Sequence, residues 1–229
     1  MPKTIESKDP NKKEGGLREA LVKEGRLIFE ENGAKELSLR EVARRVGVSE
    51  AAPFKHFEGK EGLLAAIAAS GFRELAAQRK KIAAANRDSF GRAYQMMMSY
   101  VQFARKNEGL FDMMISPRLR KFREQGELSE AASESYGLFT NAIRTLAGEH
   151  GWPDEQLDLL SHAAWGLEHG IAALMLAEVI PREESELDLD SIIEFSVGLL
   201  LRAIQAGPGV VASLPSPLVY SVKRRRAPR

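Results

Sequence analysis

The fold is decided by residues 38–63, which read SLREVARRVGVSEAAPFKHFEGKEGL. Ser38 and Glu41 have the spacing of a capping box, in which a hydroxyl and a carboxylate satisfy free amide groups at the start of a helix. One apolar face follows at helical spacing, formed by Leu39, Val42, Ala43 and Val46. Gly47, which tolerates a left-handed backbone, predicts the end of this short helix.

A second short helix is predicted after the glycine turn, from Glu50 to about Phe57, with Ser49 as its N-cap. Pro53 lies in the first turn, where the loss of one amide hydrogen is tolerated, and Pro53, Phe54 and Phe57 are expected to pack or to start the helix. Two short helices joined by a tight glycine turn form a helix-turn-helix, whose second helix can enter the major groove of DNA. Any helical hairpin with a glycine turn has the same pattern, so the pattern alone leaves DNA binding open.

If the second helix enters a groove, the segment from Ser49 to His56 faces the DNA. The side chains expected to read base edges are those of Glu50, Ala51, Ala52 and Lys55, and those of His56 and Lys60 are expected to contact phosphate groups. The sequence therefore predicts double-stranded DNA as a partner.

The rest of the chain predicts further helices and no strand, because apolar and polar residues never alternate over a strand length. The predicted helices cover Leu17 to Asn32, Lys60 to Ala85, Ser89 to Asn107, Leu110 to Met114, residues 128–147 and 153–179, and Asp190 to Ala206. Gly33 and Pro117 are expected to end the first and the fourth of these. The predicted fold is all-α, with an N-terminal three-helix helix-turn-helix domain and a C-terminal helical bundle.

The order Gly47-Val48-Ser49, then Phe54-Lys55-His56-Phe57, then Lys60-Glu61-Gly62-Leu63 closely resembles the tetracycline-repressor (TetR) family over residues 15–75. Phe54 stands where that family has a tyrosine, so the tyrosine hydroxyl that contacts phosphate is missing here. The resemblance implies a DNA-binding transcriptional regulator, usually a homodimeric repressor that a small ligand releases from a palindromic operator. It also implies that Ser38 and Arg44 contact the DNA backbone.

Four segments are expected on this basis. Residues 1–14 form a flexible N-terminal arm, 15–75 the DNA-binding domain with its helix-turn-helix at 38–57, 76–206 the ligand-binding and dimerisation domain, and 207–229 a flexible basic tail. The charges are divided along the chain. Residues 61–126 include 12 basic and 6 acidic residues, whereas residues 127–206 include 3 basic and 15 acidic residues. The basic front and the acidic back are expected to meet different partners.

A ligand cavity is predicted in the C-terminal domain. Trp165 and His169 lie at i and i+4 on one helix face, and the stretch Trp165 to Gly170 resembles a Trp/His-Gly signature in one branch of the TetR family. The predicted lining is Tyr94, Met97, Met98, Phe103, Phe111, Met114, Trp165 and His169, which fits an apolar effector because thioethers adapt to varied apolar surfaces. A histidine bonded to a backbone carbonyl and an ordinary methionine-rich core are the alternatives.

A helix-packing seam is predicted along residues 153–179, because apolar residues recur there at spacings of three and four, and a row of small residues lies beside it. The seam residues are Leu157, Leu160, Ala164, Leu167, Ile171 and Leu174. In the family the last two helices of each subunit build a four-helix dimer interface. The predicted interface residues are Leu167, Gly170, Ile171, Leu174, Leu199 and Ala203. The alternative is that this seam belongs to the core of one subunit.

Several function classes are excluded by what the sequence lacks. It has no cysteine, and no catalytic motif or phosphate-binding loop, so we expect no enzyme and no cofactor. His162 and His169 lie ~10 Å apart along one helix, too far to share a metal, so no metal site is expected. The longest apolar run, Ile171 to Ala177, is far below the ~18 residues of a membrane span, so a cytoplasmic protein with no membrane partner is expected.

One alternative from another class stays open. A helical small-molecule carrier or protein-interaction module could keep the same helix-turn-helix without specific readout of DNA. The departures at Pro53 and Phe54 are what favour this alternative.

Overall fold

The computed structural model describes residues 10–85, 88–178 and 188–212, and these ranges contain helices and turns but no strand. The α-helices are α1 (Pro10–Glu36), α2 (Leu39–Val46), α3 (Gly59–Ala84), α4 (Ser89–Lys106), α5 (Glu108–Ile115), α6 (Glu127–Glu149), α7 (Asp154–Leu176), α8 (Leu189–Gln205) and α9 (Gly209–Ala212). Two 3-10 helices are η1 (Pro53–Lys55) and η2 (Pro117–Arg123). The predicted all-α class is confirmed.

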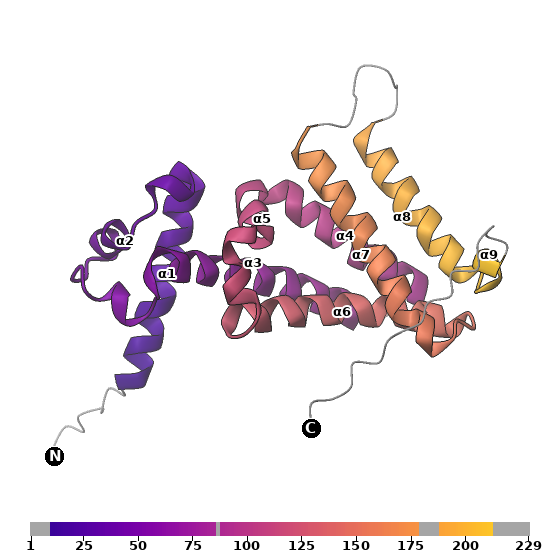
Figure 1. Ribbon diagram of the computed structural model, residues 1–229, viewed down its shortest axis with the longest axis horizontal. Helices are drawn as coiled ribbons and strands as arrows, with labels where there is room; N and C mark the ends of the chain where they lie inside the picture. The colour runs from indigo at the N-terminus through magenta and orange to yellow at the C-terminus, as the bar shows by residue number, and fades with distance from the viewer. Residues whose placement is uncertain (1–9, 86–87, 179–187, 213–229) are drawn as a thin grey trace, which may run out of the picture.

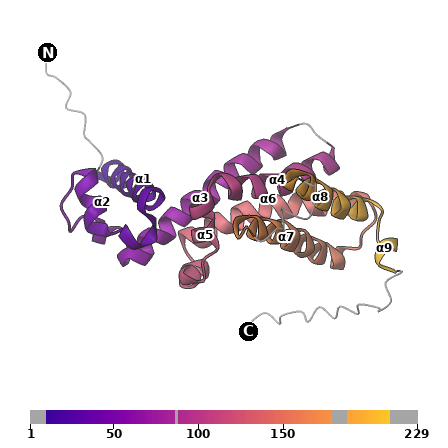
Figure 2. The same ribbon diagram turned by 90° about the horizontal axis from the view of Figure 1, so that it is seen from above.

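The helices form a small head and a larger body. α1, α2 and the beginning of α3 make the head, and the body contains α4 to α8 (Figure 1). α3 runs from the head into the body, and the view from above shows the same elongated arrangement (Figure 2). Every residue from Leu63 to Ala69 is buried, so α3 is covered on all sides where head and body meet.

The first helix begins earlier than predicted, because α1 already includes residues 10–14, which were expected to belong to a flexible arm. Gly33 has φ 75° and ψ 177°, a conformation outside the helical region, so the predicted helix end at this residue is confirmed. The last turn of α1 continues beyond this break to Glu36. The bend lets Leu37 become fully buried ahead of α2.

The ends of α2 follow the predicted pattern with one difference. The Ser38 hydroxyl accepts the Glu41 amide hydrogen at 3.2 Å, and Gly47 ends the helix with φ 78° in the left-handed region. The Glu41 carboxylate does not reach back to the cap, as a complete capping box requires. It binds Arg44 at 2.7 Å and Arg45 at 3.2 Å instead, since two guanidinium groups offer stronger partners than one amide.

The second helix of the helix-turn-helix differs most from its prediction. Residues 50–52 form turns and only Pro53–Lys55 is helical, as the 3-10 helix η1. Pro53 has no amide hydrogen for the Ser49 carbonyl, and that carbonyl accepts the Ala52 amide hydrogen at 2.9 Å instead. Ser49 also makes no side-chain cap, since η1 begins after Ala52. The segment is therefore wound by i to i+3 bonds, and the predicted α-helix from Glu50 to Phe57 is wrong.

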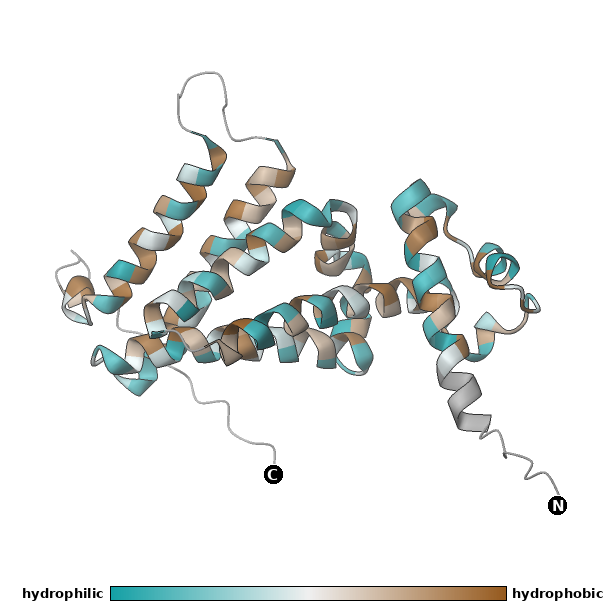
Figure 3. Ribbon diagram, turned by 180° about the vertical axis from the view of Figure 1, so that it is seen from behind, coloured by the Kyte–Doolittle hydropathy of each residue, from teal (hydrophilic) through white to brown (hydrophobic). Residues whose placement is uncertain are grey.

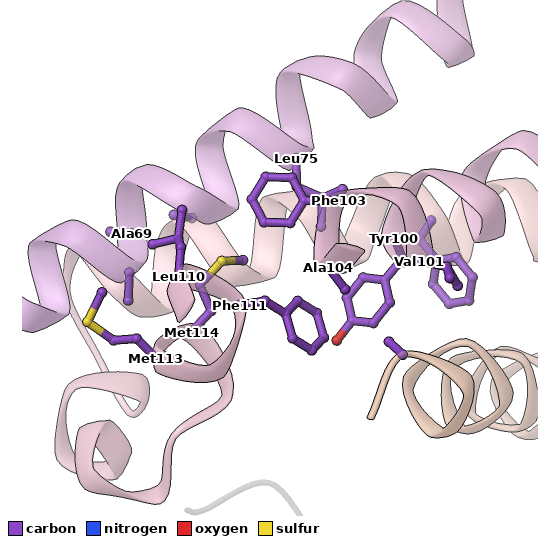
Figure 4. Close-up of a cluster of buried hydrophobic side chains, with 14 of the residues drawn as sticks. Ala69, Leu75, Tyr100, Val101, Phe103, Ala104, Leu110, Phe111, Met113 and Met114 are labelled. Carbon is purple, nitrogen blue, oxygen red and sulfur yellow. The ribbon is translucent and has the colours of Figure 1, made fainter. Parts of the chain in front are cut away.

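The body has a continuous apolar core around α3, α4, α5 and α6. Figure 4 shows Leu75, Phe103, Phe111 and Met114 in one cluster of buried side chains. Gly71 is needed where α3 meets α5, because a Cβ atom at this position would lie 2.5 Å from Met114 Sδ. Asp88 caps α4 by accepting the Gly91 amide hydrogen at 2.8 Å.

The buried face of α7 includes Leu157, Ala164 and Ile171 of the predicted seam, but Ser161, Glu168 and Met175 are buried in place of Leu160, Leu167 and Leu174. The buried positions are Leu157, Ser161, Ala164, Glu168, Ile171, Ala172 and Met175. Leu160 and Leu167 are half-buried and Leu174 is half exposed, although all three were placed in the seam. A spacing of alternating threes and fours fits both rows, and the polar Ser161 and Glu168 made the true row harder to recognise.

The C-terminal segment also departs from the prediction. α7 ends at Leu176 rather than near residue 179, and α9 lies within residues 207–229, which were expected to be a flexible tail. The Trp152 indole N–H donates to the Ile204 carbonyl at 2.6 Å and joins the start of α7 to the end of α8. The basic residues 223–226 lie outside the described residues.

Candidate functional site

The turn after α2 carries the side chains that were predicted to read DNA. Ser49, Glu50, Ala51 and Lys55 are exposed, and Ala52 is half-buried. Phe54 is 58% exposed, which corrects the expectation that it packs, whereas Pro53 and Phe57 are buried as expected. Phe54 and Lys55 therefore project outward, while the buried Pro53 and Phe57 hold the segment on the head.

Carboxylates already pair with several cations of this surface. Arg44 binds Glu41, which lowers the pKa of that carboxyl to about 2, and Arg40 lies 3.4 Å from Glu50 with both side chains exposed. Ser38 is exposed at the start of α2 and His56 is half-buried. These groups surround the turn that carries Lys55.

Two other cations of the head have structural roles. The Lys60 ammonium donates to the Lys35 carbonyl at 3.0 Å, so it also closes the end of α1. Arg45 bonds Glu24, Glu31 and Glu41, and these carboxylates raise its pKa. Arg45 therefore ties α2 to α1 rather than reaching outward.

A cavity of about 370 Å³ lies in the body between α3, α4, α6 and α7. Its lining is Phe72, Leu75, Arg79, Tyr100, Ile115, Arg123, Ala132, Ser133, Ser135, Tyr136, His162, Trp165 and Glu168. Of the predicted lining residues only Trp165 is among them. Met97, Phe103, Phe111 and Met114 are buried in the core, and Tyr94, Met98 and His169 also lie outside the lining.

A buried ion pair forms the polar wall of this cavity. Arg79 Nη2 lies 3.2 Å from Glu168 Oε1, and the two side chains are 3% and 0% exposed. Arg79 Nη1 also donates to the Ser135 carbonyl at 3.0 Å and to its hydroxyl at 3.2 Å. The guanidinium lies over the rings of Tyr100 and Phe139, at 5.6 and 5.2 Å from their centroids. α3, α4, α6 and α7 thus meet around one charged group.

Polar atoms at the cavity also lack partners. Arg79 Nε, Tyr136 Oη and Glu168 Oε2 are buried without a hydrogen bond. Because an unsatisfied buried polar atom costs ~1–3 kcal/mol, three of them around one cavity indicate a site for a polar ligand group. This polar wall was not predicted, although a glutamate within an apolar heptad row of α7 was its signal.

Burial changes the proton affinity of the groups near the cavity. It raises the pKa of Glu168 to about 8, and Arg79 offsets only part of this effect. Burial also raises the pKa of Tyr100 and lowers that of His169. The Tyr100 hydroxyl and His169 Nδ1 are hydrogen-bonded at 2.9 Å, and in Figure 4 the Tyr100 oxygen lies beside the Phe111 ring. His169 therefore bonds a side chain rather than a backbone carbonyl.

Apolar side chains remain exposed along α7 and α8. Leu174 is 50%, Phe195 71% and Leu199 60% exposed. Figure 3 shows apolar residues recurring along α8. A Cβ atom at Gly166, Gly170 or Gly198 would meet nothing within 4 Å, so these glycines serve no close approach within the chain.

The six residues predicted for the dimer interface differ in exposure. Leu174 and Leu199 are exposed, Leu167, Gly170 and Ala203 are half-buried, and Ile171 is buried within the chain. Phe195, the most exposed large apolar side chain of the described residues, was not predicted. Ile171 faces the core because the buried row of α7 runs through it.

Across residues 10–85, 88–178 and 188–212, no three His, Asp or Glu side chains gather in a way that could hold a metal ion. None of the helices within these ranges has the length and apolar character to cross a membrane.

Comparison with known proteins gives two family matches. The family described as "Bacterial regulatory proteins, tetR family" matches residues 21–67, and "Tetracyclin repressor-like, C-terminal domain" matches residues 93–200. No protein with a curated description has a matching sequence.

Solved structures also resemble the chain. A Rhodococcus sp. RHA1 protein of unknown function is 26% identical, with TM-score 0.67 over 82% of this chain and 94% of that one. A TetR/AcrR family transcriptional regulator from Thermobifida fusca is 20% identical, with TM-score 0.57 over 81% and 97%. A TetR protein from Acinetobacter baumannii AYE, solved in complex with minocycline, is 16% identical, with TM-score 0.57 over 81% and 94%.

Proposed function

Because the chain belongs to the tetR family of bacterial regulatory proteins and is a DNA-binding transcriptional regulator, we propose that it is a homodimeric repressor released from a palindromic operator by a small molecule. The proposed division of labour is DNA binding by residues 15–75 and ligand binding and dimerisation by residues 76–206. A bacterial DNA-binding regulator acts in the cytoplasm, and we propose that location for it.

The observation that carries the DNA part of this proposal is the exposed turn after α2. Glu50, Ala51, Phe54 and Lys55 are exposed on a segment that buried Pro53 and Phe57 hold against the head. In the proposed complex the side chains that read base edges are those of Ser49, Glu50, Ala51, Ala52 and Lys55. Those proposed to contact phosphate are Ser38, Arg44, His56 and Lys60.

The apolar face of α7 and α8 is the proposed contact with a second subunit. Leu174, Phe195 and Leu199 leave apolar surface in water, and Gly170 lets another helix backbone come close. A two-fold interface would hold two heads ~34–36 Å apart, one turn of DNA. This spacing explains why a dimer would select a palindromic sequence.

The proposed ligand site is the cavity beside Arg79, Glu168 and Trp165. The related Acinetobacter protein binds minocycline, which supports a small-molecule effector for this chain as well. A ligand that favours one arrangement of the two heads weakens operator binding, and linkage requires that the operator weakens ligand binding by the same factor.

The DNA part is tested by selecting bound sequences from a randomised duplex pool and measuring their affinity by fluorescence anisotropy at fixed salt. A palindromic consensus supports the proposal. Binding that depends on salt but selects no consensus would contradict it, and would favour a small-molecule or protein-binding module without specific readout.

The dimer is tested by replacing Leu199 with lysine. We expect Leu199→Lys to give monomers in light scattering, because a charge in an apolar interface is costly, and to weaken operator binding by at least tenfold. The control is Asn141→Lys, which adds the same charge at an exposed position of α6. If both variants remain dimers, the interface lies elsewhere.

A further inference from the structure

The charges around the cavity do not balance. Arg79 and Arg123 both line it, and Glu168 is the one carboxylate in the lining. The cavity is therefore positively charged even when Glu168 is ionised, and more so when Glu168 carries a proton. A cationic ligand would be repelled from such a half-enclosed site, whereas an anionic ligand would be attracted.

The unpartnered atoms also favour an acceptor on the ligand. Arg79 Nε and Tyr136 Oη are both hydrogen-bond donors, they are buried, and neither has an acceptor. Glu168 Oε2 is the third unpartnered atom, and because burial raises the pKa of Glu168 to about 8, its carboxyl group is also a donor at neutral pH. Arg123, which lines the cavity, donates from Nη2 to the Met114 carbonyl. A planar carboxylate has two oxygens that can accept bonds from guanidinium and hydroxyl donors, and such charge-assisted bonds are the stronger kind.

The remaining lining suits a flat apolar body. Phe72, Leu75 and Ile115 contribute aliphatic and aromatic surface, and the Tyr136 and Trp165 rings meet edge to face with centroids 6.0 Å apart. The volume of about 370 Å³ corresponds to about a dozen water molecules at ~30 Å³ each. A bicyclic aromatic group with a short side chain is of this size.

We propose that the effector is an amphipathic organic acid, whose carboxylate binds Arg79, Arg123 and Tyr136 and whose apolar body lies against Phe72, Leu75 and Trp165. This inference rests on the proposed function of the cavity as the effector site. It replaces the apolar effector expected from the sequence, because that expectation took the buried methionines as lining.

Three probes with one aromatic body test the proposal: 1-naphthylacetic acid, 2-(1-naphthyl)ethanol and 2-(1-naphthyl)ethylamine. They present an anion, a neutral hydroxyl and a cation to the full-length protein, and isothermal titration calorimetry at pH 7 and fixed salt gives each affinity. We expect the acid to bind at least tenfold more tightly than the alcohol, and the amine to bind most weakly.

Two variants test which side chains bind the carboxylate of the ligand. Arg123→Gln is expected to weaken binding of the acid by about tenfold and that of the alcohol by less than twofold. Arg120→Gln is the matched control, since Arg120 is exposed on the same helix η2 and does not line the cavity. Tyr136→Phe removes a hydroxyl that has no partner in the free protein, so it keeps the fold and is expected to weaken the acid severalfold.

The outcomes separate the two proposals. Equal affinities for the three probes, or tightest binding of the amine, would overturn the organic-acid inference and leave the cavity as a ligand site. If the acid binds Arg123→Gln and Tyr136→Phe as tightly as it binds the parent protein, the assigned contacts are overturned. Failure of all three probes to bind would overturn the cavity as the effector site, while the operator selection tests DNA binding independently.

Discussion

Glu168 belongs both to the buried row of α7 and to the polar wall of the cavity, two features of the body that the sequence did not reveal. It occupies the buried row of α7, where every fourth or third residue faces α4 and α6, and its only ion-pair partner among the described residues is Arg79, 89 positions earlier in the chain. A pairing over that distance leaves no local pattern, so the periodicity of α7 alone could not predict it. The same pair defines the polar wall of the cavity.

The pKa of Glu168 predicts a pH-dependent stability. An unfolded Glu168 titrates near its ordinary pKa of 4.5, and burial raises the pKa in the folded protein to about 8. Between these values the folded protein keeps a proton that the unfolded chain has released, so the free energy of unfolding falls as pH rises and becomes level above the upper value. Glu168→Gln cannot titrate, so its stability relative to the parent protein should rise by up to ~1.4 kcal/mol per pH unit within this window.

Urea unfolding of both proteins at pH 5, 6.5 and 8 measures this difference. Arg79, Tyr100 and Tyr136 face the carboxylate from α3, α4 and α6 and are unchanged in the variant. The control is Glu134→Gln, which removes an exposed carboxylate of α6 that pairs with Lys80. Parallel stability curves for the parent protein and Glu168→Gln would show that Glu168 titrates normally.

Lys55 and Lys60 are both cations of the head, but they should affect DNA binding differently. Lys55 is exposed in the predicted groove-facing turn, whereas Lys60 donates to the Lys35 carbonyl beside it. Lys55→Ala should reduce the difference in affinity between operator and random DNA, by about tenfold, because a base contact is worth ~1–3 kcal/mol.

Lys60→Ala should weaken all duplexes alike and reduce the salt slope by about one if it contacts phosphate. Anisotropy titrations at several salt concentrations measure both effects. If Lys55→Ala weakens operator and random DNA by the same factor, Lys55 does not read bases.

At the scale of elements, helix positions were predictable where caps and glycines mark the ends. The Ser38 cap, Gly33, Gly47 and Asp88 all lie at helix boundaries in the structure. Failures occurred where two patterns compete. Pro53 converts the expected α-helix into 3-10 turns, and alternating spacings of three and four on α7 fit two adjacent rows. Tertiary contacts decide between such alternatives, and one sequence does not contain them.

The close contact of α3 with α5 predicts the effect of a single methyl group. In Gly71→Ala the new Cβ atom would lie 2.5 Å from Met114 Sδ and 3.2 Å from Leu110 Cδ2, so these two buried side chains of α5 must move within the core. We expect the free energy of unfolding to fall by ~1–3 kcal/mol, which exceeds the gain in helix propensity.

The matched control for this variant is Gly137→Ala. A Cβ atom at this exposed position of α6 would meet nothing within 4 Å, so the variant should be more stable than the parent protein by ~0.5–1 kcal/mol. Urea unfolding followed by circular dichroism compares them. Stabilisation by both substitutions would mean that α3 and α5 do not pack as closely as described.

At the scale of the molecule, ion pairs join the head to the body around one short segment. Arg118 on η2 lies 2.7 Å from Glu61 at the start of α3, and Lys121 lies 3.4 Å from Glu58. Glu127 on α6 binds both Arg18 and Arg73. The same η2 segment carries Arg123, which lines the cavity. A ligand that displaces η2 would therefore act on the beginning of α3, where the head is attached.

This connection predicts a variant that separates ligand binding from its effect on DNA. Arg118→Ala removes the contact with Glu61 but changes neither the groove-facing turn nor the cavity lining. Because the pair is exposed, the affinity for operator without ligand and the affinity for ligand without operator should each change less than twofold. The factor by which ligand weakens operator binding should fall severalfold, because part of the coupling free energy passes through this contact. Arg144→Ala is the control, since it removes another exposed pair, with Asp158, that lies within the body. Anisotropy titrations of operator with and without saturating ligand measure the factor for each variant, and equal factors for Arg118→Ala and Arg144→Ala would place the coupling outside η2.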